Sequence, residues 1–185
     1  MAPYLHANGP LRSQRGEVVV YSKLPVKSES QNWVTGRVVQ TVDLDLGSQT
    51  LRLIGLHAPR PMHPPAYDYY GYWKTMIPLL TFDQGPLVIV GDFNATEHSL
   101  VYKQLKASGL RSAHDDRGRG YATTWPNGRW YVPPIRIDHV FLSPEVECEG
   151  IAEGRGAGSD HTPLIVDLRV RGYRPPQAPS SAAGE

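Results

Sequence analysis

The sequence predicts an α/β fold in which a two-layer sandwich of mixed β-sheets is flanked by helices. Segments with the apolar patterns of strands dominate the 185 residues, and the two segments with helical patterns fall between consecutive strands. Apolar residues make up 40% of the chain, which is enough for one core of ordinary domain size. This combination favours a layered α/β domain over a helical bundle or an all-β domain.

Three strands are expected in the first third of the chain. The segment GEVVVYS, residues 16–22, is rich in valine and typical of a strand. Residues 36–46 alternate between apolar and polar side chains over their second half, as a half-buried strand does. A short Gly-Ser turn at residues 47–48 leads into the strand QTLRLIGLH at 49–57, so these last two strands are predicted to form a hairpin.

Two helices are expected. Residues 66–80 form the first, and Pro78 should kink or end it because proline cannot donate the helical hydrogen bond. Residues 96–109 form the second, with Thr96 as its N-cap and Gly109 at its C-terminal cap.

Three more strands follow the first helix. The continuous apolar run of PLVIVGD, residues 86–92, is typical of a strand buried on both faces. Residues 135–143 and 163–170 are the other two. We expect one domain over residues 16–172, an irregular N-terminus at 1–15, and a disordered tail at 173–185, which is rich in Pro, Ser and Ala.

Composition excludes several classes of protein. The net charge is +1, so no overall field calls for a nucleic-acid partner. Cys148 is the single cysteine, which excludes an internal disulfide and fits a reducing, cytoplasmic setting. No apolar run approaches the roughly 18 residues that a membrane span needs, and residues 1–17 contain no apolar core of a signal peptide.

A polar pair ends the apolar strand at residues 86–92. Asp92 and Asn94 are placed at the rim of the sheet, where ligands collect in α/β proteins. A carboxylate with a neighbouring amide can hold a hard cation and orient a phosphate oxygen or a water. Taken alone, the pair is explained as well by an Asx turn that caps backbone groups after the strand.

Other strand ends carry the same kinds of residue. Asp160 and His161 precede the last strand and offer a carboxylate for metal and an imidazole for proton transfer. Asp138 lies among apolar residues and needs a partner, either a catalytic imidazole that it orients or, more simply, Arg136 in a salt bridge. His57 ends the strand at 49–57, where a hydrogen-bonded loop histidine is the alternative to a catalytic one.

These motifs together resemble a known family. GDFN, GSDHTPL and RIDHVFLS, with LIGLHAPRP and TWPNGRW, are similar to motifs of the endonuclease/exonuclease/phosphatase family, whose members have a fold like that of pancreatic deoxyribonuclease. The resemblance covers roughly residues 16 to 170. It implies the sandwich fold and the hydrolysis of phosphate esters by water with Mg²⁺ or Mn²⁺.

The resemblance also implies a role for each residue. Asp92 positions or deprotonates the attacking water, and Asn94 holds a phosphate oxygen. Asp92, Asn94 and Asp160 ligate the metal. His161 contacts the phosphate and is oriented by Asp138. His57 stabilises charge or protonates the leaving oxygen.

The segment between residues 111 and 136 contains five arginines, several beside aromatic residues. Trp125 and Arg129 are candidates for contacts with substrate, by stacking and by charge. A solvated loop whose tryptophans pack on the sheet explains the same composition equally well.

The sequence departs from the family before Gly16. Members usually begin with a strand–helix–strand unit that supplies an Asn and a metal-binding Glu, and no such unit is recognisable here. We therefore expect an N-terminally shortened domain with weakened metal binding and an open strand edge, which favours a homodimer or larger oligomer.

The predicted function is that of a metal-dependent nuclease acting on DNA rather than RNA. Phospholipid and inositol-phosphate esters are alternative substrates. A catalytically silent domain that serves as a binding or assembly module is the alternative from another class.

Overall fold

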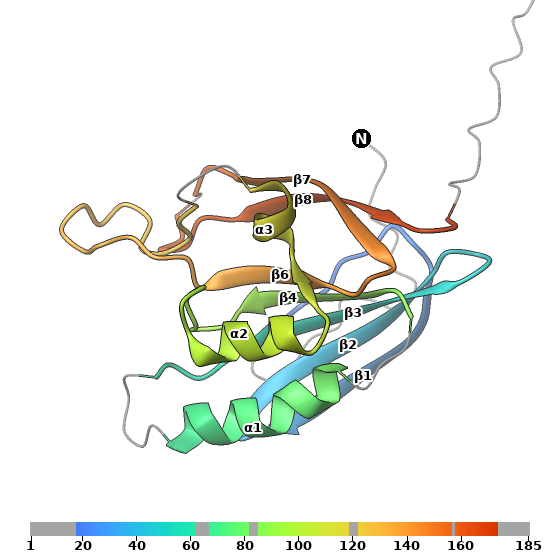
Figure 1. Cartoon of the computed structure of the whole chain (residues 1–185), viewed down its shortest axis with the longest axis horizontal. Helices are drawn as coiled ribbons and strands as arrows, with labels where there is room; N and C mark the ends of the chain where they lie inside the picture. The colour runs from blue at the N-terminus through green and yellow to red at the C-terminus, as the bar shows by residue number, and fades with distance from the viewer. Residues whose placement is uncertain (1–17, 62–66, 82–84, 119–121, 157, 174–185) are drawn as a thin grey trace, which may run out of the picture.

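The computed structural model describes residues 18–61, 67–81, 85–118, 122–156 and 158–173. They form three layers (Figure 1): two helices, a six-stranded sheet, and a two-stranded sheet on the opposite face. The elements in chain order are β1 (Val26–Val34), β2 (Arg37–Asp45), β3 (Thr50–His57), α1 (Tyr67–Thr81), β4 (Leu87–Asp92), α2 (Leu100–Ala107), β5 (Arg111–Ser112), α3 (Ala113–Arg117), β6 (Asp138–Leu142), β7 (Val146–Glu153) and β8 (Leu164–Val170).

The large sheet has the strand order β1-β2-β3-β4-β6-β5. Only β3 and β4 run parallel, because α1 crosses over between them, and every other neighbouring pair is antiparallel. β7 and β8 pair antiparallel to each other in the small sheet. The predicted sandwich of sheets flanked by helices is confirmed, with a mixed large sheet and an antiparallel small one.

Two hydrophobic clusters hold the layers together. The first lies between α1, α2 and the large sheet and contains fully buried aromatic residues such as Tyr72 and Phe93. The second lies between the two sheets and around α3, with Val140, Leu142 and Val146 at its centre. Because both faces of β4 and β6 contact a cluster, both strands are largely apolar, and polar residues stand at the end of β4 and at the start of β6.

The predicted hairpin is confirmed as β2 and β3, and the strands expected at 86–92 and 163–170 are β4 and β8. The strand expected at 135–143 begins later, at Asp138, because residue 135 instead forms an isolated bridge with Trp125. The expected first helix is α1, and it continues past Pro78 to Thr81, so the proline does not end it.

The strand predicted at residues 16–22 is wrong over its described part. Residues 18–22 still alternate between half-buried and exposed side chains, but they belong to none of the strands in the described part of the chain. Val18 lies against β3 at Gly55, where the missing side chain leaves room for it. β2 pairs with β1 on the side away from β3. β1 was not predicted, because its side chains are mostly polar and exposed and show no apolar pattern.

The second helix is shorter than predicted. It begins at Leu100, and its N-cap is Ser99, whose hydroxyl accepts from the Tyr102 amide, so Thr96 is not the cap. The C-cap is Ser108, and Gly109 follows it with a φ of +96°. β5, α3 and β7 were not predicted, since no pattern of residues marks them. The predicted N-terminus at 1–15 and all of the predicted tail except residue 173 lie outside the described residues.

Candidate active site

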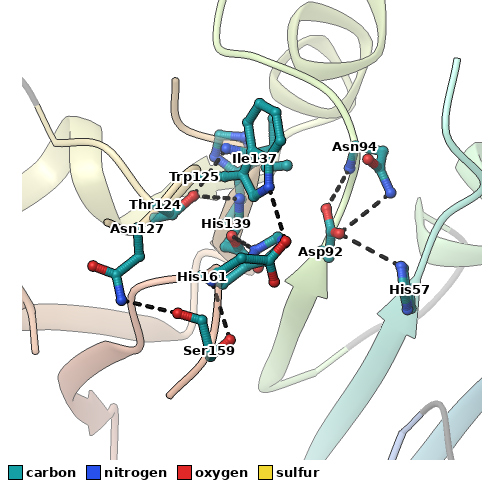
Figure 2. Close-up of polar contacts among 12 residues, drawn as sticks. His57, Asp92, Asn94, Thr124, Trp125, Asn127, Ile137, His139, Ser159 and His161 are labelled. Carbon is teal, nitrogen blue, oxygen red and sulfur yellow. Dashed lines mark hydrogen bonds and ion pairs between the residues drawn. The ribbon is translucent and has the colours of Figure 1, made fainter. Parts of the chain in front are cut away.

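Three of the predicted residues form a row across neighbouring strands. His57 of β3 is in register with Asp92 of β4, and Asp92 is in register with Asp138 of β6. Residues paired in register point to the same face of a sheet. Figure 2 shows His57 and Asp92 side by side at the ends of their strands, with Nε2 of His57 3.5 Å from Oδ2 of Asp92.

Gly91 makes the close approach of β3 and β4 possible just before this row. Its φ is +145°, which side chains rarely adopt. A Cβ at this position would lie 1.9 Å from the carbonyl oxygen of Leu56 on β3. Glycine is therefore required here, and the Gly-Asp dipeptide has a structural reason as well as a chemical one.

Asp92 and Asn94 form the Asx turn that the sequence allowed, and Asp92 is also a member of the row. Oδ1 of Asp92 accepts from the Asn94 backbone amide at 2.8 Å. The side-chain amide nitrogen of Asn94 donates to the Ala58 carbonyl at 2.8 Å and to Oδ2 of Asp92 at 3.3 Å. Asn94 has a φ of +46°, a conformation that asparagine tolerates better than most residues. With its nitrogen engaged, Asn94 offers its side-chain oxygen to a ligand.

Asp138 contacts His161, the first of the two partners that the sequence allowed. Oδ2 of Asp138 is 2.8 Å from Nδ1 of His161. The carboxylate accepts a hydrogen bond here, so Nδ1 carries the hydrogen and Nε2 is the nitrogen left for substrate. Arg136, the other candidate, lies near Glu97 instead, with 3.9 Å between Nη2 and Oε1.

Thr124 fixes the start of β6 beneath this pair. Its buried hydroxyl accepts from the backbone amides of Ile137 and Asp138, both at 3.1 Å. Its carbonyl accepts from the Thr162 amide at 2.8 Å, which attaches the segment that contains His161. Thr124 thus positions both members of the Asp138–His161 pair, and its place as the first residue of TWPNGRW did not indicate this role.

A second set of contacts holds the segment at residues 158–162. Asn127 donates from its backbone amide to the Asp160 carbonyl at 2.7 Å and from its side chain to the Ser159 carbonyl at 2.9 Å. The hydroxyl of Ser159 accepts from the His161 amide at 3.0 Å. The loop at 124–135 and the loop before β8 therefore form one unit (Figure 2).

Asp160 and Arg129 lie outside the row. The exposed carboxylate of Asp160 accepts from Nε1 of Trp125 at 3.4 Å. That hydrogen bond, with the nearby charges of His161 and Arg129, lowers the pKa of Asp160. Arg129 is exposed on the loop at 124–135, whereas Trp125 is half-buried beside Asp160.

Burial and charge act on Asp92 in the same direction. Loss of water around the carboxylate raises its pKa, and the negative charge of Asp138 raises it further. The Asn94 amide, His57 and His161 oppose this shift without cancelling it. A carboxylate in these surroundings gains from a nearby cation, which would stabilise its ionised form.

The donor atoms fit a hard divalent cation. One ligand atom each from Asp92, Asp138 and His161 lie within 4.8 Å of one another. Mg²⁺ keeps several waters and binds through one or two carboxylates, so Asp92 and Asp138 could both contribute to such a site. Each carboxylate already has a protein partner, since Asp138 accepts from His161 and Asp92 accepts from Asn94.

The chain was compared with known protein families and with curated proteins. The sequence matches the model of the Endonuclease/Exonuclease/phosphatase family over residues 2–161. No curated protein matches it at a significant level. None of the helices in the described ranges is long and apolar enough to cross a membrane.

Solved structures share the fold at low identity. The 3′ phosphatase NExo from Neisseria, bound to a product DNA hairpin, has a TM-score of 0.68 and 15% identity, with 82% of this chain and 74% of that chain covered. A mannosyl-6-phosphatase from Bacteroides thetaiotaomicron has a TM-score of 0.61 and 18% identity, with 82% and 70% covered. TDP2 from D. rerio, complexed with a single-strand DNA product, has a TM-score of 0.64 and 14% identity, with 80% and 69% covered. At these identities the structures show a shared fold. Because the family model matches residues 2–161, most of the sequence, the chain belongs to the Endonuclease/Exonuclease/phosphatase family.

Proposed function

We propose that the protein is a divalent-metal-dependent phosphodiesterase that uses Mg²⁺ or Mn²⁺ and a water nucleophile. The observation that carries this proposal is the Asp138–His161 pair, held at 2.8 Å beside the half-buried carboxylate of Asp92. A carboxylate that orients an imidazole, next to a second carboxylate, is an arrangement suited to moving protons at a phosphate.

Each residue has a role that its contacts support. Asp92 orients the attacking water and accepts its proton, helped by a pKa that burial raises above its ordinary value. Asp138 holds His161 with Nε2 toward the phosphate, where it contacts a phosphoryl oxygen. His57 lies 3.5 Å from Asp92 and can stabilise the leaving oxygen.

Asp92 and the side-chain oxygen of Asn94 are the proposed metal ligands. A bound cation there neutralises the charge that develops on the phosphoryl oxygens. Asp160, predicted as a third ligand, would have to leave Trp125, to which its carboxylate is hydrogen-bonded. We therefore propose that Asp160 contacts the metal through water.

DNA is the substrate that we propose first. Two proteins with this fold, NExo and TDP2, are bound to DNA products in their structures, and Trp125 and Arg129 remain candidates for stacking and charge contacts. The mannosyl-6-phosphatase with the same fold shows that other phosphate esters deserve a parallel test.

Plasmid DNA incubated with the protein and Mg²⁺ or Mn²⁺ tests the nuclease proposal directly. We expect nicking that EDTA abolishes and that Asp92→Ala removes. Asp167→Ala is the matched control, because Asp167 is an exposed aspartate on β8 away from the row. Equal nicking by wild type and Asp92→Ala would refute the assignment. If calorimetry detects no binding of Mg²⁺ or Mn²⁺ at millimolar concentration, the silent assembly module is the better reading.

Self-association is a proposal that the small sheet supports. In the described part of the chain, β8 pairs with β7 alone, so its other edge is open. Ile165 on this strand is 60% exposed. Open apolar edges favour pairing with a second copy. Light scattering at micromolar concentration tests this, and a stable monomer would contradict it.

A further inference from the structure

A large groove opens directly from the row of catalytic candidates. It has a volume of about 1030 Å³ and is lined by α1, the start of α2 and parts of the loop at 124–135. Asp92, Asn94 and His161 line one end of it. The groove is therefore continuous with the position where a phosphate would react, and it is far larger than a phosphate group.

The lining of this groove is mostly apolar. Leu100 at the start of α2 is 68% exposed, and Ile135 of the loop is 37% exposed. Tyr70 and Trp73 of α1 contribute aromatic surface. Exposed apolar side chains gathered in one hollow mark a binding site rather than ordinary surface.

Positive charge is sparse in the groove. Arg60 and Lys74 are its cationic residues within the described chain. Proteins that follow a nucleic-acid backbone line their grooves with several lysines and arginines, so that each phosphate is neutralised. This lining suits a neutral, apolar occupant better than a polyanion.

We infer that the groove holds an apolar organic group, a hydrocarbon chain or an aryl ring, on a phosphodiester whose phosphate lies at Asp92 and His161. This inference rests on the proposed phosphodiesterase function and differs from it in the substrate class that it favours. Because the groove is continuous with the row of catalytic candidates, we expect its occupant to be an ester group of the bound substrate. Leu100, Ile135 and Tyr70 are then residues that determine specificity.

Three diesters of 4-nitrophenyl phosphate test the inference, because they share one leaving group. Their second ester groups are methyl, hexyl and 5′-thymidyl. In each reaction the oxygen of water bonds to phosphorus and the bond from phosphorus to the nitrophenolate oxygen breaks. Nitrophenolate leaves with the electron pair, and the proton of the water is released. The absorbance of the released nitrophenolate gives kcat and KM.

We expect kcat/KM for the hexyl ester to exceed that for the methyl ester by about tenfold or more, because burial of each methylene favours binding. Leu100→Asp should reduce this ratio toward one, mainly through KM. Leu79→Asp is the matched control, since Leu79 of α1 is also an exposed leucine but does not line the groove, and it should leave the ratio unchanged. Equal hexyl and methyl values, or a preference for the thymidyl ester over the hexyl ester, would overturn the inference.

A binding measurement separates this inference from the proposed function. Calorimetry with hexylphosphonate and methylphosphonate in the presence of EDTA requires no turnover. One outcome is that no ester is hydrolysed, hexylphosphonate binds more tightly than methylphosphonate, and Leu100→Asp weakens the binding of hexylphosphonate. The inference about the groove is then supported and the enzymatic proposal fails. If neither phosphonate binds and no ester is hydrolysed, both fail.

Discussion

The buried imidazole of His139 makes the stability of the fold depend on pH. His139 lies on β6 next to Asp138, is 1% exposed, and donates from Nε2 to the Ala95 carbonyl at 2.7 Å. Loss of water around the ring lowers its pKa from 6.5 to about 3. Between these two values the unfolded chain binds a proton that the folded chain does not, so stability falls as the pH decreases.

The size of the effect follows from these two pKa values. At pH 7 protonation of the unfolded state costs the fold ~0.2 kcal/mol, and at pH 5 it costs ~2 kcal/mol. The loss at pH 5 is set by the pKa of the unfolded chain, because the folded imidazole is neutral at that pH. We therefore expect the free energy of unfolding to fall by about 2 kcal/mol from this one residue between pH 7 and pH 5.

Urea denaturation at pH 7 and pH 5 measures the effect as a difference between variants. His139→Gln keeps an amide nitrogen near the position of Nε2 but cannot titrate, so it should lose about 2 kcal/mol less than wild type between the two pH values. His98→Gln is the control, since His98 is exposed. The reasoning fails if His139→Gln and wild type lose equal stability, or if the His139 ring in the folded protein titrates near pH 6.5 by NMR.

Three further predictions concern the row of site residues. Gly91→Ala would place a methyl carbon 1.9 Å from a backbone oxygen of β3, so urea denaturation should show that the free energy of unfolding falls by about 3 kcal/mol or more. Gly85→Ala is the control, because Gly85 also has a positive φ but has open space around it, and this variant should lose less stability. Asp138→Asn should lower kcat by about 100-fold or more with little change in KM, because an amide cannot stabilise the protonated imidazole; a change in KM alone would contradict the assigned role. Asp92→Asn should raise the Mg²⁺ concentration needed for binding by about tenfold, measured by calorimetry, and an unchanged affinity would remove Asp92 from the metal ligands.

Part of the site could be predicted because its residues follow apolar strands. Asp92 ends β4, and Asp138 begins β6, so the change from apolar to polar marks both in the sequence. His161 was recognisable from its place before β8. Once β4 and β6 are assigned as antiparallel neighbours in one sheet, the end of β4 and the start of β6 must lie at the same edge. His161 precedes a strand of the other sheet, so its place beside them does not follow from this pairing.

Other features leave no such mark. β1 is an edge strand, and because its side chains are mostly exposed and polar, its sequence shows no alternation of apolar and polar residues. Thr124 acts through its hydroxyl on backbone amides of a strand 13 and 14 residues away, a contact that depends on the path of the intervening loop. The groove is assembled from α1, α2 and that loop, so none of its segments indicates it separately.

The in-register row of His57, Asp92 and Asp138 ties catalysis to strand pairing. If β4 paired one residue out of step with β3, Asp92 would no longer lie opposite His57, and the buried faces of the strand would be exchanged. A misassembled sheet could retain its secondary structure and still have no site. Recovery of ligand binding after refolding would therefore report the correct alignment of three strands, which circular dichroism cannot distinguish from a slipped one.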